Sequence, residues 1–170
     1  MKKIGLLSDT HGFLDRRVFE FFSDVDEIWH AGDVGGIELL DELKKFKPLR
    51  AVYGNIDDAR LRTEYPEDNR FIVEGFDVWI THIGGYPEHY SSRVRNILQA
   101  KPPDIFVCGH SHILRVMRDA KYRNMLCLNP GAAGIHGFHK IKTMLRFTLD
   151  NKKVTSMEAI ELGKRGEILE

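Results

Sequence analysis

In the first half of the chain, short continuous hydrophobic runs alternate with segments whose apolar residues have helical spacing. Continuous runs predict strands buried on both faces, and apolar residues three or four apart predict amphipathic helices that pack on a sheet. The pattern predicts strands at 2–8, 26–30 and 49–53, with helices at 14–23 and 37–44 between them. This β-α-β-α-β order favours a parallel sheet with right-handed crossovers.

The second half of the chain predicts mostly strands. Residues 59–68 are polar and are interpreted as an exposed loop. A hairpin, a helix stopped by two prolines and a series of largely antiparallel strands follow. The expected strands are 70–74, 77–81, 104–108, 113–117, 123–128, 142–149 and 154–161, and the expected helix is 90–98. The chain shows neither internal repeat nor linker, so residues 1–170 are predicted to form a single domain.

Metal-ligand residue types stand beside glycines at five predicted strand ends. These residues are Asp9 and His11, Asp33, Asn55, His82, and His110 with His112. Sites in open α/β folds form beyond the carboxyl ends of the strands, so the five turns can converge on one place. Seven nitrogen and oxygen ligands exceed the need of one ion and suit two ions about 3.5–4 Å apart that share a carboxylate.

Each of these pieces also has an ordinary structural explanation. Asp and Asn are common in turns, and a single histidine such as His82 is more often a hydrogen-bonded, partly buried residue. The run Gly109-His110-Ser111-His112 is the most specific piece, because two imidazoles straddle one turn. It is the complete set, in order and always at a strand end, that favours a metal centre. Cysteine is absent from the set, which argues against a structural zinc site and suits Mn, Ni, Fe or Zn.

Composition narrows the choice of partners. Lys and Arg together number 25, as do Asp and Glu, so no overall charge favours nucleic acid or an anionic membrane. Cys108 and Cys127 lie in apolar runs and are interpreted as reduced core residues of a cytoplasmic protein. No hydrophobic run approaches the length of a transmembrane span, so no membrane partner is expected.

The ordered set resembles the calcineurin-like metallophosphoesterase family, whose pattern is D-x-H, G-D, G-N-x-[D/E], a lone H and G-H-x-H. In this chain the pattern reads Asp9-Thr10-His11, Gly32-Asp33, Gly54-Asn55-Ile56-Asp57, His82 and Gly109-His110-Ser111-His112. The resemblance spans residues 1–135 or so and looks closest to a branch of small bacterial and archaeal phosphodiesterases. It implies an α/β fold, a four-layer βα-sandwich in which two mixed β-sheets are flanked by helices.

The resemblance also implies a hydrolase with a dinuclear metal centre. It assigns Asp9, His11 and His112 to the first metal ion and Asn55, His82 and His110 to the second, with Asp33 bridging both. A hydroxide bridging the two ions would attack phosphorus and break a P–O bond. The Asn55 amide would contact a phosphate oxygen, and Asp57 would orient neighbouring groups.

One departure from the family pattern bears on the substrate. Many family members have His or Cys after the Gly-Asn pair, whereas this chain has Ile56, which cannot move a proton. General acid catalysis contributes 10²–10⁴-fold, so phosphodiesters or activated aryl phosphates are the expected substrates. His89, His136 and His139 lie on predicted loops and could replace the missing acid, although solvated loop histidines are common.

Two other functions stay open. A retromer subunit uses the same fold as a protein-interaction scaffold without catalysis, and other family members are phosphomonoesterases. The substrate is expected to be a small phosphodiester or phosphate ester rather than nucleic acid, because no basic stripe is present. The helix at 90–98 or a strand edge could form a homodimer. The loops 56–68, 83–90 and 132–140 would select the substrate, and the candidate contacts are Tyr53, Arg60, Arg62, Tyr86 and Tyr90.

Overall fold

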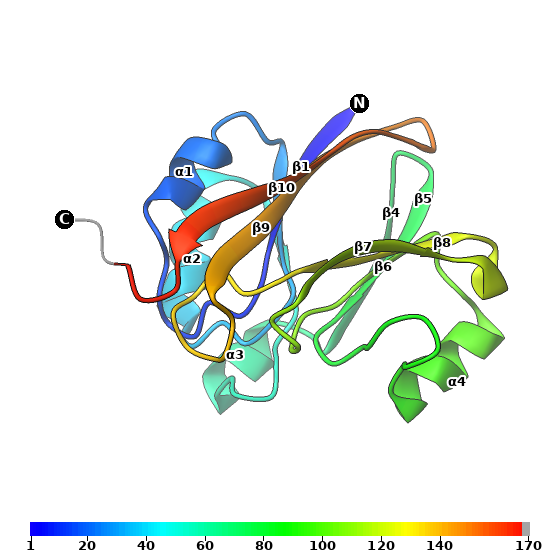
Figure 1. Ribbon diagram of the computed structural model, residues 1–170, viewed down its shortest axis with the longest axis horizontal. Coiled ribbons are helices and arrows are strands. Elements are labelled where there is room, and N and C mark those ends of the chain that lie inside the picture. The colour runs from blue at the N-terminus through cyan, green and yellow to red at the C-terminus, as the bar shows by residue number, and fades with distance from the viewer. Residues whose placement is uncertain (168–170) are drawn as a thin grey trace.

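The computed structural model describes residues 1–167 and contains two five-stranded sheets (Figure 1). The first sheet comprises β1 (Lys2–Leu7), β2 (Glu27–His30), β3 (Leu49–Ala51), β9 (Ile141–Asp150) and β10 (Lys153–Lys164). The second comprises β4 (Asp68–Val73), β5 (Phe76–Thr81), β6 (Ile105–Val107), β7 (Leu114–Asp119) and β8 (Met125–Pro130). The helices are α1 (Arg17–Phe21), α2 (Ile37–Phe46), α3 (Ala59–Glu64) and α4 (Ser92–Ala100), and a 3₁₀ turn spans Ala120–Tyr122.

Both sheets are mixed. The strand orders are β10-β9-β1-β2-β3 and β4-β5-β6-β8-β7. In the first sheet β1, β2 and β3 are parallel, as the β-α-β-α-β pattern predicts, while β9 and β10 run antiparallel beside them. In the second sheet β5, β6 and β8 are parallel, so the expectation of an antiparallel strand at β8 holds only for its pairing with β7. The three parallel strands of each sheet bring their carboxyl ends to one edge.

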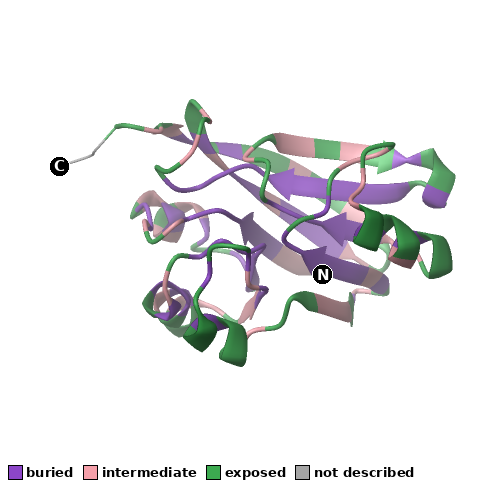
Figure 2. Ribbon diagram, turned by 90° about the horizontal axis from the view of Figure 1, so that it is seen from below, coloured by how far each residue is buried: buried purple, intermediate pink, exposed green. Residues whose placement is uncertain are grey.

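Alternating side chains divide the core into three apolar layers. Ile4 and Leu6 of β1 lie in the layer between the two sheets, whereas Leu7 lies in the layer under α1 and α2. On the second sheet Val78 faces the other sheet, and Trp79 packs beneath α4. Figure 2 shows the resulting contrast between buried strands and helices exposed on their outer faces. Helices, sheet, sheet and helix make the four-layer sandwich that the family resemblance implies.

Residues 59–68 are not the exposed loop that their polarity predicts. A short helix, α3, occupies Ala59–Glu64, and the Asp58 side chain accepts a hydrogen bond from the Leu61 amide at 3.0 Å. Leu61 is fully buried. A six-residue helix with one buried residue has no hydrophobic periodicity to read, so only its capping aspartate marked it.

The helix predicted at 14–23 is shorter in the structure, where α1 covers Arg17–Phe21. Asp15 accepts a hydrogen bond from the Arg17 amide at 2.9 Å, which starts the helix late, although Leu14 still packs in the same apolar layer. Cys108 and Cys127 are free and buried, as expected. None of the helices among residues 1–167 is long and apolar enough to cross a membrane.

Candidate metal centre

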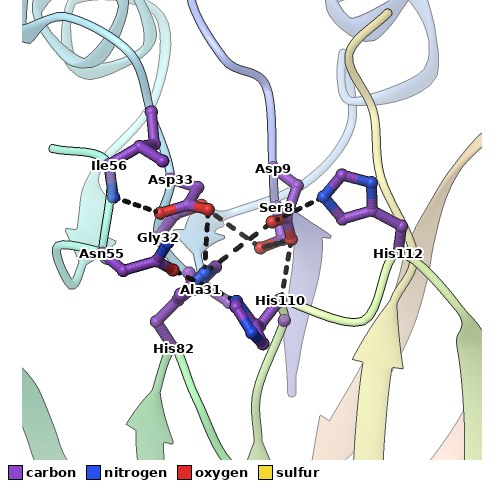
Figure 3. A network of polar contacts seen from close by, with 12 residues as sticks. Ser8, Asp9, Ala31, Gly32, Asp33, Asn55, Ile56, His82, His110 and His112 are labelled. Carbon is purple, nitrogen blue, oxygen red and sulfur yellow. Dashed lines mark hydrogen bonds and ion pairs between the residues drawn. The ribbon is translucent and has the colours of Figure 1, made fainter. Parts of the chain in front are cut away.

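All seven predicted ligands lie at the edge where the carboxyl ends of the parallel strands meet. Asp9 and His11 follow β1, Asp33 follows β2, Asn55 follows β3, His82 follows β5, and His110 and His112 follow β6. Figure 3 shows the side chains of Asp9, Asp33, Asn55 and His82 pointing toward one another from four loops, with His110 and His112 on a fifth. Two clusters form, Asp9–His11–His112 and Asp33–His82–His110, and in each the nearest ligand atoms lie within 4.8 Å of one another. The first cluster contains the residues predicted to bind one metal ion, and the second combines His82 and His110, predicted for the other ion, with the predicted bridging residue Asp33.

Main-chain hydrogen bonds fix the loops to one another. The amides of Asp9 and His11 donate to the carbonyls of Gly32 and Asp33, each at 3.0 Å. The Gly109 amide donates to the His82 carbonyl at 3.0 Å on the second sheet, and the Gly134 amide to the Asp9 carbonyl at 3.2 Å between the sheets. These hydrogen bonds therefore hold the loops that carry the ligands in fixed positions relative to one another.

Two glycines of the motif pattern permit this close approach. A Cβ at Gly54 would lie 2.1 Å from Asp33 Oδ1, and a Cβ at Gly109 would lie 2.2 Å from Ser8 Oγ. Neither distance is possible for a side chain. The glycine before Asn55 and the glycine before His110 are thus required by loop packing, in addition to any role in turning the chain.

Five of the ligand residues have left-handed backbone. The φ angles of Asp9, His11, Asp33, His110 and His112 lie between 47° and 71°. Asp and His adopt this region more readily than most residues, but it still carries a conformational cost. Strained backbone concentrated at one edge is typical of a functional centre.

In each of the two carboxylates, one oxygen accepts hydrogen bonds from nearby residues and the other lies beside the candidate ligand histidines. Asp9 Oδ2 accepts hydrogen bonds from Ser8 Oγ at 2.6 Å and from the His110 amide at 3.1 Å, while Oδ1 lies 3.1 Å from His112 Nε2. Asp33 Oδ1 accepts from the Ile56 amide at 3.0 Å. Asp33 Oδ2 lies 3.1 Å from His82 Nε2 and 3.5 Å from His11 Nε2, one residue of each cluster. This oxygen is close to both clusters, and its bridging role stays a prediction.

A backbone carbonyl sets the protonation of His82. Its Nδ1 lies 2.7 Å from the Ala31 carbonyl oxygen, which can only accept, so Nδ1 carries the proton. In neutral His82 the lone pair is then on Nε2, which faces Asp33 and the centre. Metal-binding histidines are commonly oriented in this way. On the same side of the centre, Asn55 Oδ1 lies 3.1 Å from His110 Nδ1, a separation that two ligands of one ion can have.

The donor set fits bound metal ions. In addition to Arg115 Nε, three buried side-chain atoms of residues 1–167 have no hydrogen-bond partner, namely Asp9 Oδ1, His11 Nε2 and His82 Nε2. Buried polar atoms are rarely left unsatisfied, and each such atom calls for an explanation. All three are the atoms that a divalent ion would take as ligands, and oxygen with imidazole nitrogen suits several transition metals.

The protonation equilibria agree with this arrangement. Burial raises the pKa of Asp9, but the adjacent His11, His112 and His82 and the Ser8 hydroxyl outweigh it and hold the pKa of Asp9 well below its ordinary value. Burial lowers the pKa of His82, but Asp33 and Asp9 outweigh burial and raise it. The carboxylates are thus charged, and the imidazoles lie in the field of that charge.

Asp57 connects two of the ligand loops. Its carboxylate accepts hydrogen bonds from the amides of Gly54 at 2.8 Å, Gly35 at 2.9 Å and Val34 at 3.2 Å. The loops that carry Asp33 and Asn55 are thereby joined through one buried side chain. This geometry suits the predicted orienting role of Asp57.

His30 is a packed residue, as its position in a strand suggests. Its Nδ1 accepts from the Gly32 amide at 3.1 Å, so Nε2 carries the proton and donates to Thr10 Oγ1 at 3.0 Å. The Thr10 hydroxyl then donates to the Val34 carbonyl at 2.8 Å. Burial lowers the pKa of His30 to about 4, which keeps the ring neutral in this network.

Asn129 positions the loop after β6, and the sequence offered only its place in an Asn-Pro-Gly turn. Its amide nitrogen donates to the Gly109 carbonyl at 3.0 Å and to Ser111 Oγ at 3.1 Å, and its oxygen accepts from the Gly131 amide at 3.0 Å. It therefore contacts the residues on both sides of His110, the backbone of Gly109 and the side chain of Ser111. Its side chain is buried, which only the tertiary structure reveals.

The three histidines considered as replacement acids lie in different surroundings. The His136 ring stacks on His11 with centroids 4.8 Å apart. His139 Nδ1 lies 3.2 Å from His112 Nδ1, and burial lowers the pKa of His139. His89 packs on Tyr86. The structure brings His136 and His139 to the centre's ligands, and a proton-donating role for either stays a prediction.

Most of the candidate substrate contacts have structural partners. Arg62 donates to the carbonyls of Asp57, Asn55 and Gly54, and Arg60 faces Glu38 at 3.5 Å. The Tyr90 hydroxyl donates to Asp119 at 2.7 Å, with burial and Asp119 raising its pKa far above the ordinary value. The guanidinium carbon of Arg115 lies over the Tyr86 ring, 3.7 Å from the ring centroid.

Comparison with known proteins gives a consistent family. The sequence profile of the calcineurin-like phosphoesterase superfamily domain matches residues 1–152. A probable metallophosphoesterase of Methanothermobacter thermautotrophicus is 33% identical over 136 residues, which cover 76% of each chain. A probable metallophosphoesterase of Methanocaldococcus jannaschii is 31% identical over 166 residues, which cover 93% of this chain and 81% of the relative.

Solved structures share the fold at lower identity. A protein described as a novel archaeal phosphodiesterase has a TM-score of 0.75 at 24% identity, covering 94% of this chain and 99% of its own. Vps29 from Entamoeba histolytica, solved with zinc, has a TM-score of 0.70 at 16% identity, covering 96% and 99%. These likenesses concern the fold.

Proposed function

Because the chain belongs to the calcineurin-like phosphoesterase superfamily, we propose that it is a phosphodiesterase with a dinuclear metal centre. The observation that carries the proposal is the pair of ligand clusters that share Asp33 Oδ2, with three buried ligand atoms lacking partners among residues 1–167. The free, buried cysteines of the protein, Cys108 and Cys127, support a cytoplasmic location. The archaeal neighbour described as a phosphodiesterase is consistent with the reaction class.

Two bound divalent ions would supply a nucleophilic water at neutral pH and neutralise charge that develops on the phosphoryl oxygens. The protein's part is to present ligands without rearrangement. Ser8 and the His110 amide hold one oxygen of Asp9 so that the other faces the centre. The Ala31 carbonyl turns the lone pair of His82 inward in the same way.

Asn55 would contact the substrate directly. Its oxygen lies beside His110, which leaves the amide hydrogens available for a phosphoryl oxygen on the exposed side of the centre. Asp57 accepts from the Gly54 amide and from the amides of Val34 and Gly35, and so fixes the turn that begins at Gly54 against the loop after β2. Asn55 thus acts on the phosphate, and Asp57 keeps Asn55 in place.

Ile56 supports a preference for good leaving groups. Its amide is bound to Asp33, and its side chain is 46% exposed at the rim of the centre, where it cannot donate a proton. Departure of a poor alkoxide leaving group would lose the 10²–10⁴-fold that a general acid supplies. Diesters and aryl phosphates with acidic leaving groups depend less on this help.

An apolar rim around the ligands supports the same preference. Exposed apolar residues directly follow or lie next to residues of the site, namely Ile56, Ile83, Ile113, Ile135 and Phe138. Ile113 and Phe138 line a cavity of about 480 Å³ together with His110, His112 and His136. Apolar walls beside a few polar groups are typical of small-molecule sites. The rim suits an ester group with an aromatic or other apolar part.

The decisive experiment compares hydrolysis of bis-p-nitrophenyl phosphate and p-nitrophenyl phosphate, with Mn²⁺ added and with metal stripped. We expect metal-dependent cleavage that is faster on the diester by more than about tenfold. Asp33→Asn keeps the size and the left-handed backbone preference but removes the bridging charge, and it should lower the rate at least about 100-fold. Asp41→Asn, on the exposed face of α2, is the matched control.

Each other result selects a different function. Faster cleavage of the monoester would identify a phosphomonoesterase. Absence of cleavage with every metal, in a folded protein that still binds Mn²⁺, would overturn catalysis and favour a protein-interaction scaffold. Equal activity of wild type and Asp33→Asn would remove Asp33 from the centre.

A further inference from the structure

The loop between Gly134 and Lys140 brings a histidine to the back of a proposed metal ligand. His139 and His112 lie with ring centroids 5.1 Å apart and rings nearly perpendicular, at 78°. The two Nδ1 atoms are 3.2 Å apart, and His112 Nε2 lies on the other side of its ring, 3.1 Å from Asp9 Oδ1. His139 therefore contacts the ligand at the nitrogen that faces away from the centre.

Hydrogen-bond chemistry assigns the protons along this chain of groups. His139 Nε2 lies 2.7 Å from the Gly134 carbonyl oxygen, which can only accept, so Nε2 carries the proton. In a neutral His139, Nδ1 is then an acceptor. Its neighbour, His112 Nδ1, must be the donor, because two lone pairs at this distance would repel. This leaves the lone pair of His112 on Nε2, directed at the centre.

Asp9 faces the other nitrogen of His112. Asp9 Oδ1 makes no hydrogen bond with any residue in the described range 1–167, and it lies 3.1 Å from His112 Nε2. A lone pair on Nε2 beside a carboxylate oxygen is unfavourable by itself and becomes favourable when a cation binds both atoms. This tautomer of His112 therefore suits a centre that holds metal.

The loop is built to keep His139 in place. Arg165, just beyond β10, donates from Nε to the His139 carbonyl at 2.8 Å and from its guanidinium end to the Ile135 carbonyl at 3.3 Å. At Gly137, with φ of +131°, a Cβ would lie 2.3 Å from His112 Nδ1 and 3.2 Å from His139 Nδ1. Only glycine allows the loop to close over the pair of rings. The Gly134 amide, in turn, is bound to the Asp9 carbonyl.

We propose that His139 is a positioning residue for the metal centre, which accepts a hydrogen bond from His112 Nδ1–H and so keeps His112 Nε2 free to bind metal. The inference rests on the ligand set of the proposed function. It assigns His139 a role other than proton donation to the leaving group. Groups behind metal-binding histidines typically change metal affinity 10–100-fold when they are removed.

The test compares His139→Gln, His139→Phe and wild type in calorimetric titrations with Mn²⁺ alone. Glutamine can accept from His112 through Oε1 and donate to Gly134 through its amide, whereas phenylalanine keeps the ring and can do neither. We expect His139→Phe to weaken one of two binding steps 10–100-fold and His139→Gln to stay within about threefold of wild type. Lys140→Ala, an exposed neighbour in the same segment, controls for changes of the loop.

A second measurement needs no metal and no variant. Long-range ¹H–¹⁵N correlation spectra of the metal-free wild type report which ring nitrogen of His112 carries hydrogen, and we expect Nδ1. A His112 with hydrogen on Nε2 and none on Nδ1 would overturn the proposal. So would tight Mn²⁺ binding by His139→Phe, or equal weakening by His139→Gln and His139→Phe. Because none of these readouts requires turnover, a failure of the phosphodiesterase proposal would show separately, in the hydrolysis assay.

Discussion

At the scale of single residues, the ligands combine metal-binding chemistry with an unfavourable backbone. His110 has a φ angle of 71°, and its side chain is exposed, so little packing offsets the cost. A residue with a Cβ is about 1–2 kcal/mol less stable in this region than in the right-handed one, whereas glycine is not. The folded state accepts this cost because the left-handed turn places the imidazole beside His82 and Asn55.

This strain predicts an unusual order of stability. In metal-free protein, His110→Gly should be more stable than His110→Ala by about 1 kcal/mol, because both lose the imidazole but only alanine keeps the strain. Urea denaturation in the presence of a chelator measures the difference. The matched pair Asn96→Gly and Asn96→Ala, on the exposed face of α4, should show the reverse order. An alanine variant at 110 as stable as the glycine variant would contradict the strain.

At the scale of elements, α3 serves the centre although it carries none of the ligands. Arg62 projects from this helix over the Tyr53 ring at 4.7 Å and donates to the carbonyls of Asp57 at 2.7 Å and Asn55 at 3.1 Å. Its planar guanidinium can satisfy several carbonyls at once, which an ammonium cannot do in the same geometry. The helix that follows β3 thus fixes the turn that precedes it.

Arg62→Lys should therefore be costly for a conservative exchange. We expect the free energy of unfolding to fall by about 1–2 kcal/mol, since a lysine can replace only part of the hydrogen bonding. Arg60→Lys is the matched control on the same helix, where the exposed pair with Glu38 contributes less than about 0.5 kcal/mol. Equal losses in the two variants, measured by urea denaturation, would exclude a special role of the guanidinium.

At the scale of the whole molecule, a buried ion pair links β9 to the segment before α1. Lys142 is 1% exposed, and its Nζ lies 2.7 Å from Asp15 Oδ2. Asp15 also accepts hydrogen bonds from the Arg17 amide at 2.9 Å and from Arg17 Nε at 3.1 Å. Burial raises the pKa of Asp15, but the bonds from Arg17 and Lys142 outweigh burial, so its pKa lies below the ordinary value.

Lys142→Met should lower the free energy of unfolding by about 3 kcal/mol at pH 7, because it leaves a buried carboxylate with one cationic partner fewer. The lowered pKa of Asp15 means that this stabilisation is fully present above the unfolded-state value of about 3.9 and is lost as the pH falls through the folded-state value. The difference from wild type should therefore shrink below about pH 4. Lys153→Met, at the exposed start of β10, is the control, and a difference independent of pH would contradict the linkage.

The sequence by itself determined the strands, most of the helices and the seven candidate ligands. These are local properties, because hydrophobic spacing reflects one element at a time, and a turn beside a glycine is recognisable without knowing its neighbours. The same locality explains what was wrong. Residues 59–64 form a helix with one buried side chain, which leaves no periodic signal in the chain.

Only the tertiary structure decided how these local pieces meet. It packed the two sheets on each other through one apolar layer, buried Lys142 against Asp15, and placed His139 behind His112 across 27 residues of sequence. Such contacts depend on how strands and loops pack. The sequence around a loop histidine does not show whether its side chain faces solvent or a metal ligand. The ligand residues of the centre are therefore recognisable from short stretches of sequence, whereas the protonation and orientation of their side chains depend on the packing of distant segments.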